Sequence, residues 1–239
     1  MFTNETVKKL ATKLQTSEIN IRREYFQHLF LSLFYNQKET SQIYFKGGTA
    51  LRIIYNSPRF SEDLDFDSSS TDIQLIESAI ITTLSEIQKS GVETEIDEAK
   101  RTNNGYLATM RFSFLGYIVP IRIEISFRDM NKKGEAIFIT NDMLPDYMIL
   151  QLIQGQLIEG KMAALLDRKK PRDFYDLYFI LRANLLPVEK RTLLKEVLDI
   201  LKNSNISFDK ELREFLPQNQ WLIIKDFSSS LEREIKRFI

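Results

Sequence analysis

The 239-residue chain contains no cysteine and a single histidine, His28. The absence of cysteine excludes disulfides, iron–sulfur clusters, zinc–thiolate sites and thiol nucleophiles. A Ser-His-Asp triad would have to use His28, which lies in the apolar stretch REYFQHLFLSLFY. Because apolar residues recur there at helical spacing, we interpret His28 as a packing or partly exposed residue on a helix rather than a catalytic one.

The sequence also lacks an excess of charge of either sign and has no long apolar run. Its 33 basic and 33 acidic residues cancel, which argues against indiscriminate binding to nucleic acids or membranes. The apolar runs are far shorter than the roughly 18 residues that a membrane span requires. The first residues, MFTNETVKKLATKLQTSE, lack the apolar core of a secretory signal. We therefore expect a soluble cytoplasmic protein with no membrane partner.

Hydrophobic periodicity predicts a mixed first half of the chain. Apolar residues recurring every four positions predict a helix over 17–36, preceded by one over 5–15. QIYFKGG predicts a strand that runs into a turn, TALRIIY a short helix, and DLDFDS the next strand. Further along, we expect a helix over 71–90 and extended segments near 92–98, 105–115 and 117–128, with Gly116 at a hairpin.

The last third of the sequence is predicted to be helical. YMILQLIQ, near 147–154, fits either a strand or a helix, and we favour a strand. Helices are then expected from Leu157 to about Arg168, from Arg172 to about Ala183, and onward to the end. We therefore predict an α+β fold with two domains, residues 1–150 and residues 151–239.

Two glycines stand where the first predicted strand meets a helix. Gly47 and Gly48 leave backbone N–H groups uncovered, and the helix N-terminus adds a partial positive charge. A phosphate can approach such a turn. The hydroxyl of Thr49 could add a donor to that phosphate, or it could serve as an ordinary helix N-cap.

Two aspartates follow this turn after 13 intervening residues counted from Thr49. Asp63 and Asp65 are two apart on a predicted strand, so both carboxylates point to one face about 7 Å apart. Leu64 and Phe66 fill the opposite, apolar face. Two like charges on one face are best accommodated by a cation between them, and magnesium prefers oxygen ligands near phosphates. The pattern therefore predicts a site for a nucleoside triphosphate with magnesium.

Chance gives roughly four or five acidic pairs at this spacing in such a composition, and we interpret Glu93 with Glu95 as a solvated pair of this kind. A site with two metal ions needs a third carboxylate. Glu124 is the best candidate, since it lies on the polar face of the alternating strand VPIRIEISF. The alternative is an exposed strand residue paired with Arg122 or Arg128.

The segments GGTAL and RFSEDLDF resemble the signature of the nucleotidyltransferase superfamily that includes DNA polymerase beta, in the version found in the AbiEii/AbiGii toxin family. EGKMAALLDRKKPRDFYDLYFIL, residues 159–181, is similar to the lysine helix and the following Arg-Asp-x-x-Asp helix of that family. The resemblance covers about residues 20–182. It implies a nucleotidyltransferase fold, with a mixed sheet flanked by helices and a helical C-terminal part that completes the active-site cleft.

The resemblance also implies an activity and a partner. The reaction would move a nucleoside monophosphate from a nucleoside triphosphate to an acceptor, with two Mg²⁺ ions as cofactors. In related toxins the acceptor is RNA, tRNA in some members, and the toxin belongs to a toxin–antitoxin or phage-defence system with a cognate antitoxin. Alternatives are transfer to a small molecule or a protein, or a non-catalytic nucleotide-binding module.

The resemblance assigns roles to residues of both predicted domains. Asp63 and Asp65 would be catalytic and bind metal together with Glu124, and Lys161 and Asp173 would also be catalytic. The residues implied to contact the nucleotide are Gly47, Gly48, Thr49 and Lys161.

The residues of the helical block also have plain structural interpretations. Lys161 could simply be solvated, and Asp173, in the first turn of a helix that Pro171 opens, would favour the helix dipole in any case. We interpret Asp176 as a supporting contact to Lys161 or Arg172.

Two basic features of the sequence keep alternative interpretations. Arg59 could pair with the two aspartates or grip a phosphate. The basic run at 168–172 suits an RNA backbone, or it is a charged loop between two helices.

Overall fold

The computed structural model describes residues 2–203 and 205–239 of the chain. These residues form two compact units. The first unit contains the residues up to Asn56 and those of Phe60–Ile153, and the second contains Ser57–Arg59 and Gln154–Ile239. No helix among the described residues is both long and apolar enough to cross a membrane.

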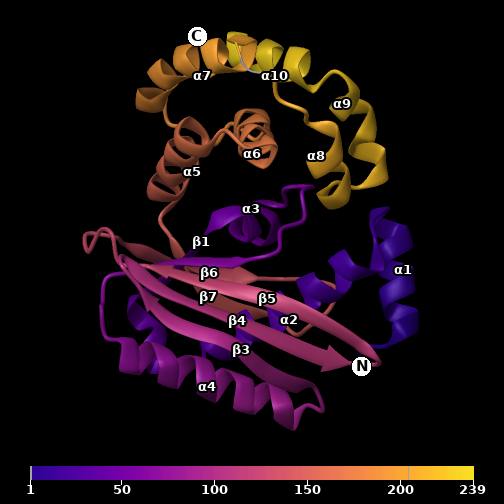
Figure 1. Cartoon of the computed structure of the whole chain (residues 1–239), viewed down its shortest axis with the longest axis vertical. Helices are drawn as coiled ribbons and strands as arrows, with labels where there is room; N and C mark the ends of the chain where they lie inside the picture. Colours follow the sequence, from indigo (N-terminus) through magenta and orange to yellow (C-terminus); the bar gives the residue numbers. More distant parts are fainter. Residues whose placement is uncertain (1, 204) are drawn as a thin grey trace. The chain divides into compact units, whose positions relative to one another are not determined.

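The first unit is built on a seven-stranded mixed sheet (Figure 1). The strand order is β3-β4-β5-β2-β1-β7-β6. Strands β2 and β5, and strands β1 and β7, pair in parallel, and the other neighbours pair antiparallel. In chain order the strands are β1 (Ile43–Lys46), β2 (Leu64–Ser68), β3 (Glu93–Thr102), β4 (Gly105–Phe114), β5 (Tyr117–Ser126), β6 (Gly134–Ile139) and β7 (Tyr147–Leu152).

Helices cover both faces of this sheet. Helix α4 lies along one face and the short helix α3 along the other (Figure 1). The side chains of Ser17 and Asp72 accept hydrogen bonds from the first turns of α2 and α4, and thereby satisfy donors that a helix start leaves open. The helical segments of this unit are α1 (Asn4–Leu14), α2 (Glu18–Phe34), the 3-10 turn η1 (Lys38–Gln42), α3 (Gly47–Tyr55) and α4 (Ile73–Lys89).

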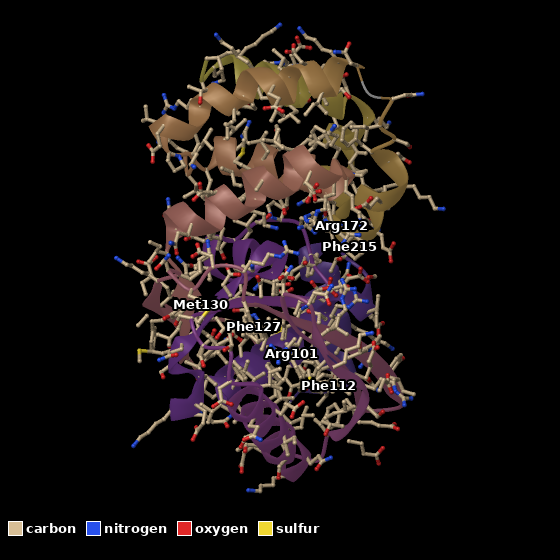
Figure 2. The ribbon with its side chains drawn as sticks, turned by 60° about the vertical axis from the view of Figure 1, so that its left-hand side comes forward. Arg101, Phe112, Phe127, Met130, Arg172 and Phe215 are labelled. Atoms are coloured by element: carbon tan, nitrogen blue, oxygen red, sulfur yellow. The ribbon has the colours of Figure 1, made fainter. Side chains whose placement is uncertain are left out.

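The core of the first unit lies between the sheet and helix α2. Phe34 of α2 packs against Phe66 of β2, which also contacts Phe45 of β1. Phe26 of α2 stacks on Phe112 of β4, which Figure 2 labels. All five rings are at most 2% exposed. This aromatic layer fixes β1 and β2 side by side, and it leaves their other face to polar side chains.

His28 lies in this core, as the sequence predicted. It is buried, and its Nδ1 shares a hydrogen bond of 2.6 Å with the hydroxyl of Tyr147 in β7. Burial, and then the nearby charge of Arg52, lower the pKa of His28 to about 4. The imidazole is therefore neutral at pH 7 and acts as a buried polar group with a partner.

The second unit is helical. Helix α5 begins at Gln154, three residues before the predicted start, and Pro171 opens α6 at its first position, where the missing N–H costs nothing. Tyr175 of α6 stacks on Phe227 of α10 in the core of this unit. Its segments are α5 (Gln154–Arg168), α6 (Pro171–Arg182), η2 (Val188–Leu193), α7 (Leu194–Asn203), α8 (Asp209–Phe215), η3 (Gln218–Gln220), α9 (Trp221–Lys225) and α10 (Phe227–Lys236).

The structure confirms the predicted α+β fold and most of its elements, including the strand over 147–152 and the hairpin at Gly116. The prediction lacked one strand, β6. This strand is at the edge of the sheet, and only Ile139 among its side chains is buried, so it has no hydrophobic alternation to detect. Strand β3 also runs to Thr102 rather than to residue 98, because an irregularity between Ile96 and Glu98 interrupts its pattern.

Candidate active site

The turn from β1 into α3 requires glycine at its first position. Gly47 has φ +86°, a left-handed conformation that side chains other than glycine rarely adopt. A Cβ placed on Gly47 would lie 2.1 Å from Oδ2 of Asp65. Gly47 therefore serves two purposes, because it makes the turn and it lets the Asp65 carboxylate approach the first residue of α3. That approach places a negative charge at the positive end of the helix.

Thr49 connects the helix to the segment that bears the carboxylates. Its side chain is fully buried, and its hydroxyl donates a short hydrogen bond to the backbone carbonyl of Asp63. Thr49 is the third residue of α3 and not its N-cap, which is Lys46. The hydroxyl proton is thus used within the protein, and the predicted contact of Thr49 with a phosphate stays a prediction.

Three aspartates alternate along β2. Asp63 immediately precedes the strand, and Asp65 and Asp67 lie two and four residues further on. Since side chains alternate, all three belong to the face opposite Leu64 and Phe66, as predicted for the first two. Asp63 and Asp65 are half-buried. Their carboxylates are therefore less solvated than those of the exposed pair Glu93 and Glu95.

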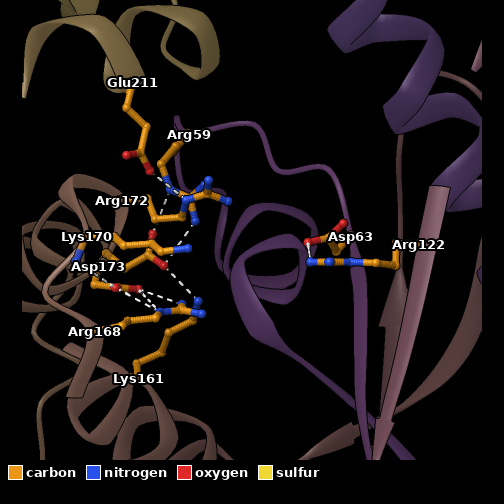
Figure 3. Close-up of polar contacts among 10 residues, drawn as sticks. Arg59, Asp63, Arg122, Lys161, Arg168, Lys170, Arg172, Asp173 and Glu211 are labelled. Carbon is orange, nitrogen blue, oxygen red and sulfur yellow. Dashed lines mark hydrogen bonds and ion pairs between the residues drawn. The ribbon is translucent and has the colours of Figure 1, made fainter. Parts of the chain in front are cut away.

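Basic residues on both neighbouring strands lie beside this row of carboxylates. Lys46 of β1 forms an ion pair of 2.5 Å with the buried Asp67. Arg122 of β5 donates to Oδ2 of Asp63 at 2.9 Å, as Figure 3 shows. Neither Lys46 nor Asp67 was among the predicted site residues. Asp67 could have been found because it lies two residues after Asp65 and therefore on the same face of the strand. Lys46 could have been found from the alternation of side chains on the strand before the glycine turn.

Glu124 lies beside Asp65 in the parallel pairing of β2 and β5. Its Oε1 is 3.1 Å from the same Arg122 nitrogen that contacts Asp63. Burial alone would lower the pKa of Arg122, but the hydrogen bond and charge of Asp63, followed by the charges of Glu124 and Asp65, raise it. Glu124 therefore pairs with Arg122, as one interpretation expected, and it lies beside Asp65. Its role as a third metal ligand stays a prediction.

The carboxylates supply a donor set suited to magnesium, although the three of them do not gather into one group. Among the described residues, no three acidic or histidine side chains form a group that could hold a metal ion. However, Asp63 and Glu124 meet at one nitrogen of a guanidinium, a positively charged group that lies between the two carboxylates. Carboxylate oxygens are the ligands that Mg²⁺ prefers. The chemistry of Asp63, Asp65 and Glu124 fits such an ion.

Lys161 and Asp176 lie in the helical unit, together with Arg59. Asp176 is buried and accepts hydrogen bonds from Arg59 at 2.8 and 3.0 Å and from Lys161 at 2.7 Å. Figure 3 labels the two basic residues. Arg59 pairs with Asp176, and the two alternatives considered for Arg59 stay predictions. The expected supporting contact of Asp176 to Lys161 is confirmed.

Asp173 is almost fully buried and is held by two groups of its own unit. Arg168 donates to both carboxylate oxygens, at 2.7 to 3.1 Å, and the backbone N–H of Lys170 donates at 3.2 Å (Figure 3). The second contact satisfies an open donor at the start of α6. The structure therefore shows the stabilising role of Asp173 that was its plain interpretation. Its predicted catalytic role stays a prediction.

In the basic run at 168–172, the two arginines form ion pairs and the two lysines are exposed. Arg168 pairs with Asp173, while Arg172 pairs with Glu211 at 2.6 Å and lies over the ring of Phe215 (Figure 2). Lys169 and Lys170 form the short connection between α5 and α6 and are exposed.

The predicted site residues are divided between the two units. The second unit contains Lys161 and Asp173, and the first contains Gly47, Gly48, Thr49, Asp63, Asp65 and Glu124. Within the first unit, the structure brings the glycine turn and the carboxylates together at the ends of adjacent strands, with Gly47 against Asp65.

Comparison with known proteins decides the family. A family profile described as the nucleotidyl transferase AbiEii toxin of type IV toxin–antitoxin systems matches residues 29–236. The chain belongs to the AbiEii toxin family. This confirms the resemblance inferred from the glycine and aspartate motifs, and it makes the protein a nucleotidyltransferase. No curated protein matches the AbiEii chain significantly.

Two crystal structures of Helicobacter pylori proteins share the fold of this AbiEii chain. The protein JHP933 is 21% identical with a TM-score of 0.66, and the alignment covers 93% of each chain. A second structure, described as a candidate nucleotidyltransferase, is 20% identical with a TM-score of 0.65 and covers 93% of this chain and 95% of that one. At this level of identity the likeness shows the fold, and it extends over both units.

Proposed function

We propose that the protein is a magnesium-dependent nucleotidyltransferase that moves a nucleoside monophosphate from a nucleoside triphosphate to RNA, with tRNA as the acceptor. It would act in the cytoplasm as the toxin of a toxin–antitoxin or phage-defence system and would have a cognate antitoxin. The observation that supports the metal-dependent chemistry most directly is that Asp63 and Glu124 meet at one cationic nitrogen, with Asp65 beside Glu124 on the adjacent strand.

Asp63, Asp65 and Glu124 are the residues that would hold magnesium in this proposal. When bound, the metal supplies positive charge for the attacking and leaving oxygens of the phosphoryl group. The residues of α3 contribute separately, since the first N–H groups of the helix and its dipole favour a phosphate at the Gly47–Gly48 turn. Thr49 keeps Asp63 in place through the backbone carbonyl.

The reaction is an in-line displacement. The hydroxyl oxygen of the acceptor forms a bond to the α-phosphorus, and the bond from that phosphorus to the oxygen bridging to the β-phosphate breaks. Pyrophosphate leaves, and the hydroxyl proton passes to water or to one of the carboxylates. Lys161 and Asp173 remain proposed catalytic residues on the strength of the family motif, with Lys161 also contacting the nucleotide.

The decisive experiment is a transfer assay with magnesium, each α-labelled nucleoside triphosphate in turn, and total bacterial RNA. Label in a tRNA-sized band is expected with the wild type and not with Asp63→Asn. Asp97→Asn is the matched control, because Asp97 is a strand carboxylate that also pairs with an arginine, Arg111, on the neighbouring strand. Chelation with EDTA should abolish labelling, and added magnesium should restore it.

The other outcomes distinguish the alternatives. Label in protein alone would identify a protein acceptor, and label in a small molecule would identify a small-molecule acceptor. Activity that survives in Asp63→Asn would reject the proposed mechanism. Binding of magnesium and nucleotide without release of pyrophosphate would identify a non-catalytic binding module.

The RNA acceptor is supported by the exposed pair Lys169 and Lys170, which can contact phosphates. Replacing both by glutamine should weaken RNA binding and reduce the slope of log affinity against log salt by about 0.7 per lost contact to a single strand. Lys8 and Lys9 are the matched control, because they are adjacent exposed lysines on α1. An equal effect of the two double variants would argue against a specific role for the basic run.

The toxin role can be tested in growing bacteria. Induced expression of the wild type should arrest growth, and expression of Asp63→Asn at the same level should not. Coexpression of the cognate antitoxin should restore growth. Equal growth with the wild type and Asp63→Asn would contradict a toxicity that depends on nucleotidyl transfer.

A further inference from the structure

Arg122 occupies the position between two of the proposed metal ligands. A single nitrogen of its guanidinium lies 2.9 Å from Oδ2 of Asp63 and 3.1 Å from Oε1 of Glu124. Asp63 immediately precedes β2 and Glu124 lies in β5, and these two strands pair in parallel with Asp65 directly beside Glu124. The arginine thus neutralises a group of like charges that would otherwise repel one another.

This arrangement conflicts with metal binding at the same oxygens. A divalent cation on Asp63 and Glu124 would meet the guanidinium charge at short range, and arginine cannot escape by losing its proton. Arg122 must therefore move aside when a metal ion binds. Its side chain can do so, because it is 47% exposed and lies at the surface of the sheet.

We propose that Arg122 is an internal counter-ion that competes with the divalent cation for Asp63 and Glu124. This inference rests on the proposed function, in which those carboxylates hold magnesium. In the free protein, Arg122 keeps the carboxylates neutralised and the affinity for free metal low. The site then fills only when metal is supplied at high concentration or together with a nucleotide that adds its own interactions.

The chain contains a matched control for this arginine. Arg111 on β4 also bridges two carboxylates, Glu95 at 2.8 Å and Asp97 at 2.6 Å, and its side chain is 37% exposed. It therefore has the same chemistry and a similar exposure on the same sheet. Neither of its partners is a proposed metal ligand.

The test is a calorimetric titration of the full-length protein with Mn²⁺ alone, without nucleotide. Four proteins are compared: wild type, Arg122→Gln, Arg111→Gln and Asp63→Asn. We expect Arg122→Gln to bind Mn²⁺ about three- to tenfold more tightly than the wild type, the range that the loss of two partly exposed ion pairs allows. Arg111→Gln should match the wild type, and Asp63→Asn should lose the site.

A second variant tests whether the positive charge of Arg122, rather than the shape of its side chain, lowers the affinity for Mn²⁺. Arg122→Lys keeps the positive charge and should keep the weak Mn²⁺ affinity of the wild type. Thermal unfolding without metal gives an independent readout, since Arg122→Gln should be less stable than the wild type and should gain more stability on addition of Mn²⁺. Arg111→Gln should show no extra gain.

Other results would overturn the inference. If wild type and Arg122→Gln bind Mn²⁺ with equal affinity, and Asp63→Asn does not bind it, the proposed metal site is supported. The proposed competition between Arg122 and the cation is then wrong. Weaker binding by Arg122→Gln has the same meaning. If none of the proteins binds Mn²⁺ at millimolar concentration, the metal site of the proposed function is wrong, and this inference is wrong with it.

Discussion

Arg59 and Asp176, 117 positions apart in the sequence, form a buried bidentate ion pair with donor–acceptor distances of 2.8 and 3.0 Å. Their side chains are 3% and 2% exposed. Lys161 adds a third charge to the pair, 2.7 Å from the second oxygen of Asp176. Asp176 is therefore the anion that neutralises two basic side chains within the helical unit, one of which comes from the segment shortly before Asp63.

Replacing Asp176 by asparagine should strongly destabilise the protein. The change leaves Arg59 and Lys161 without their main counter-charge, and breaking a buried pair in this way costs about 3–5 kcal/mol of unfolding free energy. Urea denaturation measures the difference. The control is Asp209→Asn, whose partner Arg213 forms an exposed ion pair, so that a loss below about 1 kcal/mol is expected. Equal denaturation midpoints for the two variants would contradict this account.

The contribution of Asp176 should also depend on pH. Burial raises the pKa of its carboxyl, but the charges of Arg59 and Lys161 outweigh burial and lower it to about 2, below the ordinary value of 3.8. As pH falls, the unfolded chain therefore binds the proton first. The stability difference between wild type and Asp176→Asn should be constant above about pH 5 and should shrink from about pH 4 towards pH 2. A difference that is still unchanged near pH 3 would be evidence against the lowered pKa.

The single histidine permits a direct measurement of a second pKa. We expect the one imidazole C2–H resonance of the folded protein to titrate near pH 4, because burial and the charge of Arg52 disfavour the charged form of His28. In concentrated urea the midpoint should return to about 6.5. Since the folded pKa is the lower one, His28 should reduce stability as pH falls from about 6.5 to 4. A folded-state midpoint near 6.5 would show that the ring is accessible to water.

The candidate site was predictable where local pattern decides the structure. Alternation in VPIRIEISF predicted that Glu124 lies on the polar face of β5. The glycine turn, together with the apolar side chains of Leu64 and Phe66, predicted that Asp63 and Asp65 share the opposite, polar face. These are effects of side-chain period and backbone freedom, which short segments determine by themselves. The adjacency of Asp65 and Glu124 is different, because it depends on the order of the strands across the sheet.

Partner choice was not predictable from neighbouring residues. Arg59 pairs with Asp176, 117 positions away in the sequence, and the hydroxyl of Thr49 bonds to a backbone carbonyl rather than remaining available at the turn. Both hydrogen bonds depend on tertiary packing, because a buried donor bonds to an acceptor that the fold brings near it, and that acceptor can be distant in the sequence. Strand β6 was missed for a related reason, since its position at the sheet edge comes from its pairing with β7 and not from its own side chains.

Thr49 offers a test of whether its hydroxyl positions Asp63 or contacts the nucleotide. Thr49→Val keeps the shape and removes the donor, so it should reduce stability by about 1–3 kcal/mol and lower kcat. Thr49→Ser keeps the hydroxyl and should restore most of kcat. The result that would favour the phosphate contact is a Thr49→Val variant with normal stability, normal kcat and a raised KM for the nucleotide.

Alanine substitutions at Gly47 and Gly91 distinguish two effects: the strain of a left-handed backbone, and a clash between a new Cβ and the carboxylate of Asp65. Both residues have positive φ, +86° and +84°. A Cβ on Gly47 would lie 2.1 Å from the carboxylate of Asp65, whereas a Cβ on Gly91 would meet nothing within 4 Å. Alanine at either position therefore introduces the same left-handed strain, about 1–2 kcal/mol. Only at Gly47 must a carboxylate also move.

We expect Gly91→Ala to lose this modest stability and to retain full nucleotidyl transfer. Gly47→Ala should lose more stability and at least about tenfold in kcat/KM, because displacement of a metal-binding carboxylate by a few tenths of an ångström or more misplaces the reacting groups. Circular dichroism and urea denaturation would establish that Gly47→Ala is folded before its rate is measured. If the two alanine variants are equally active, Asp65 does not need its position against the start of α3, and the site must use other carboxylates.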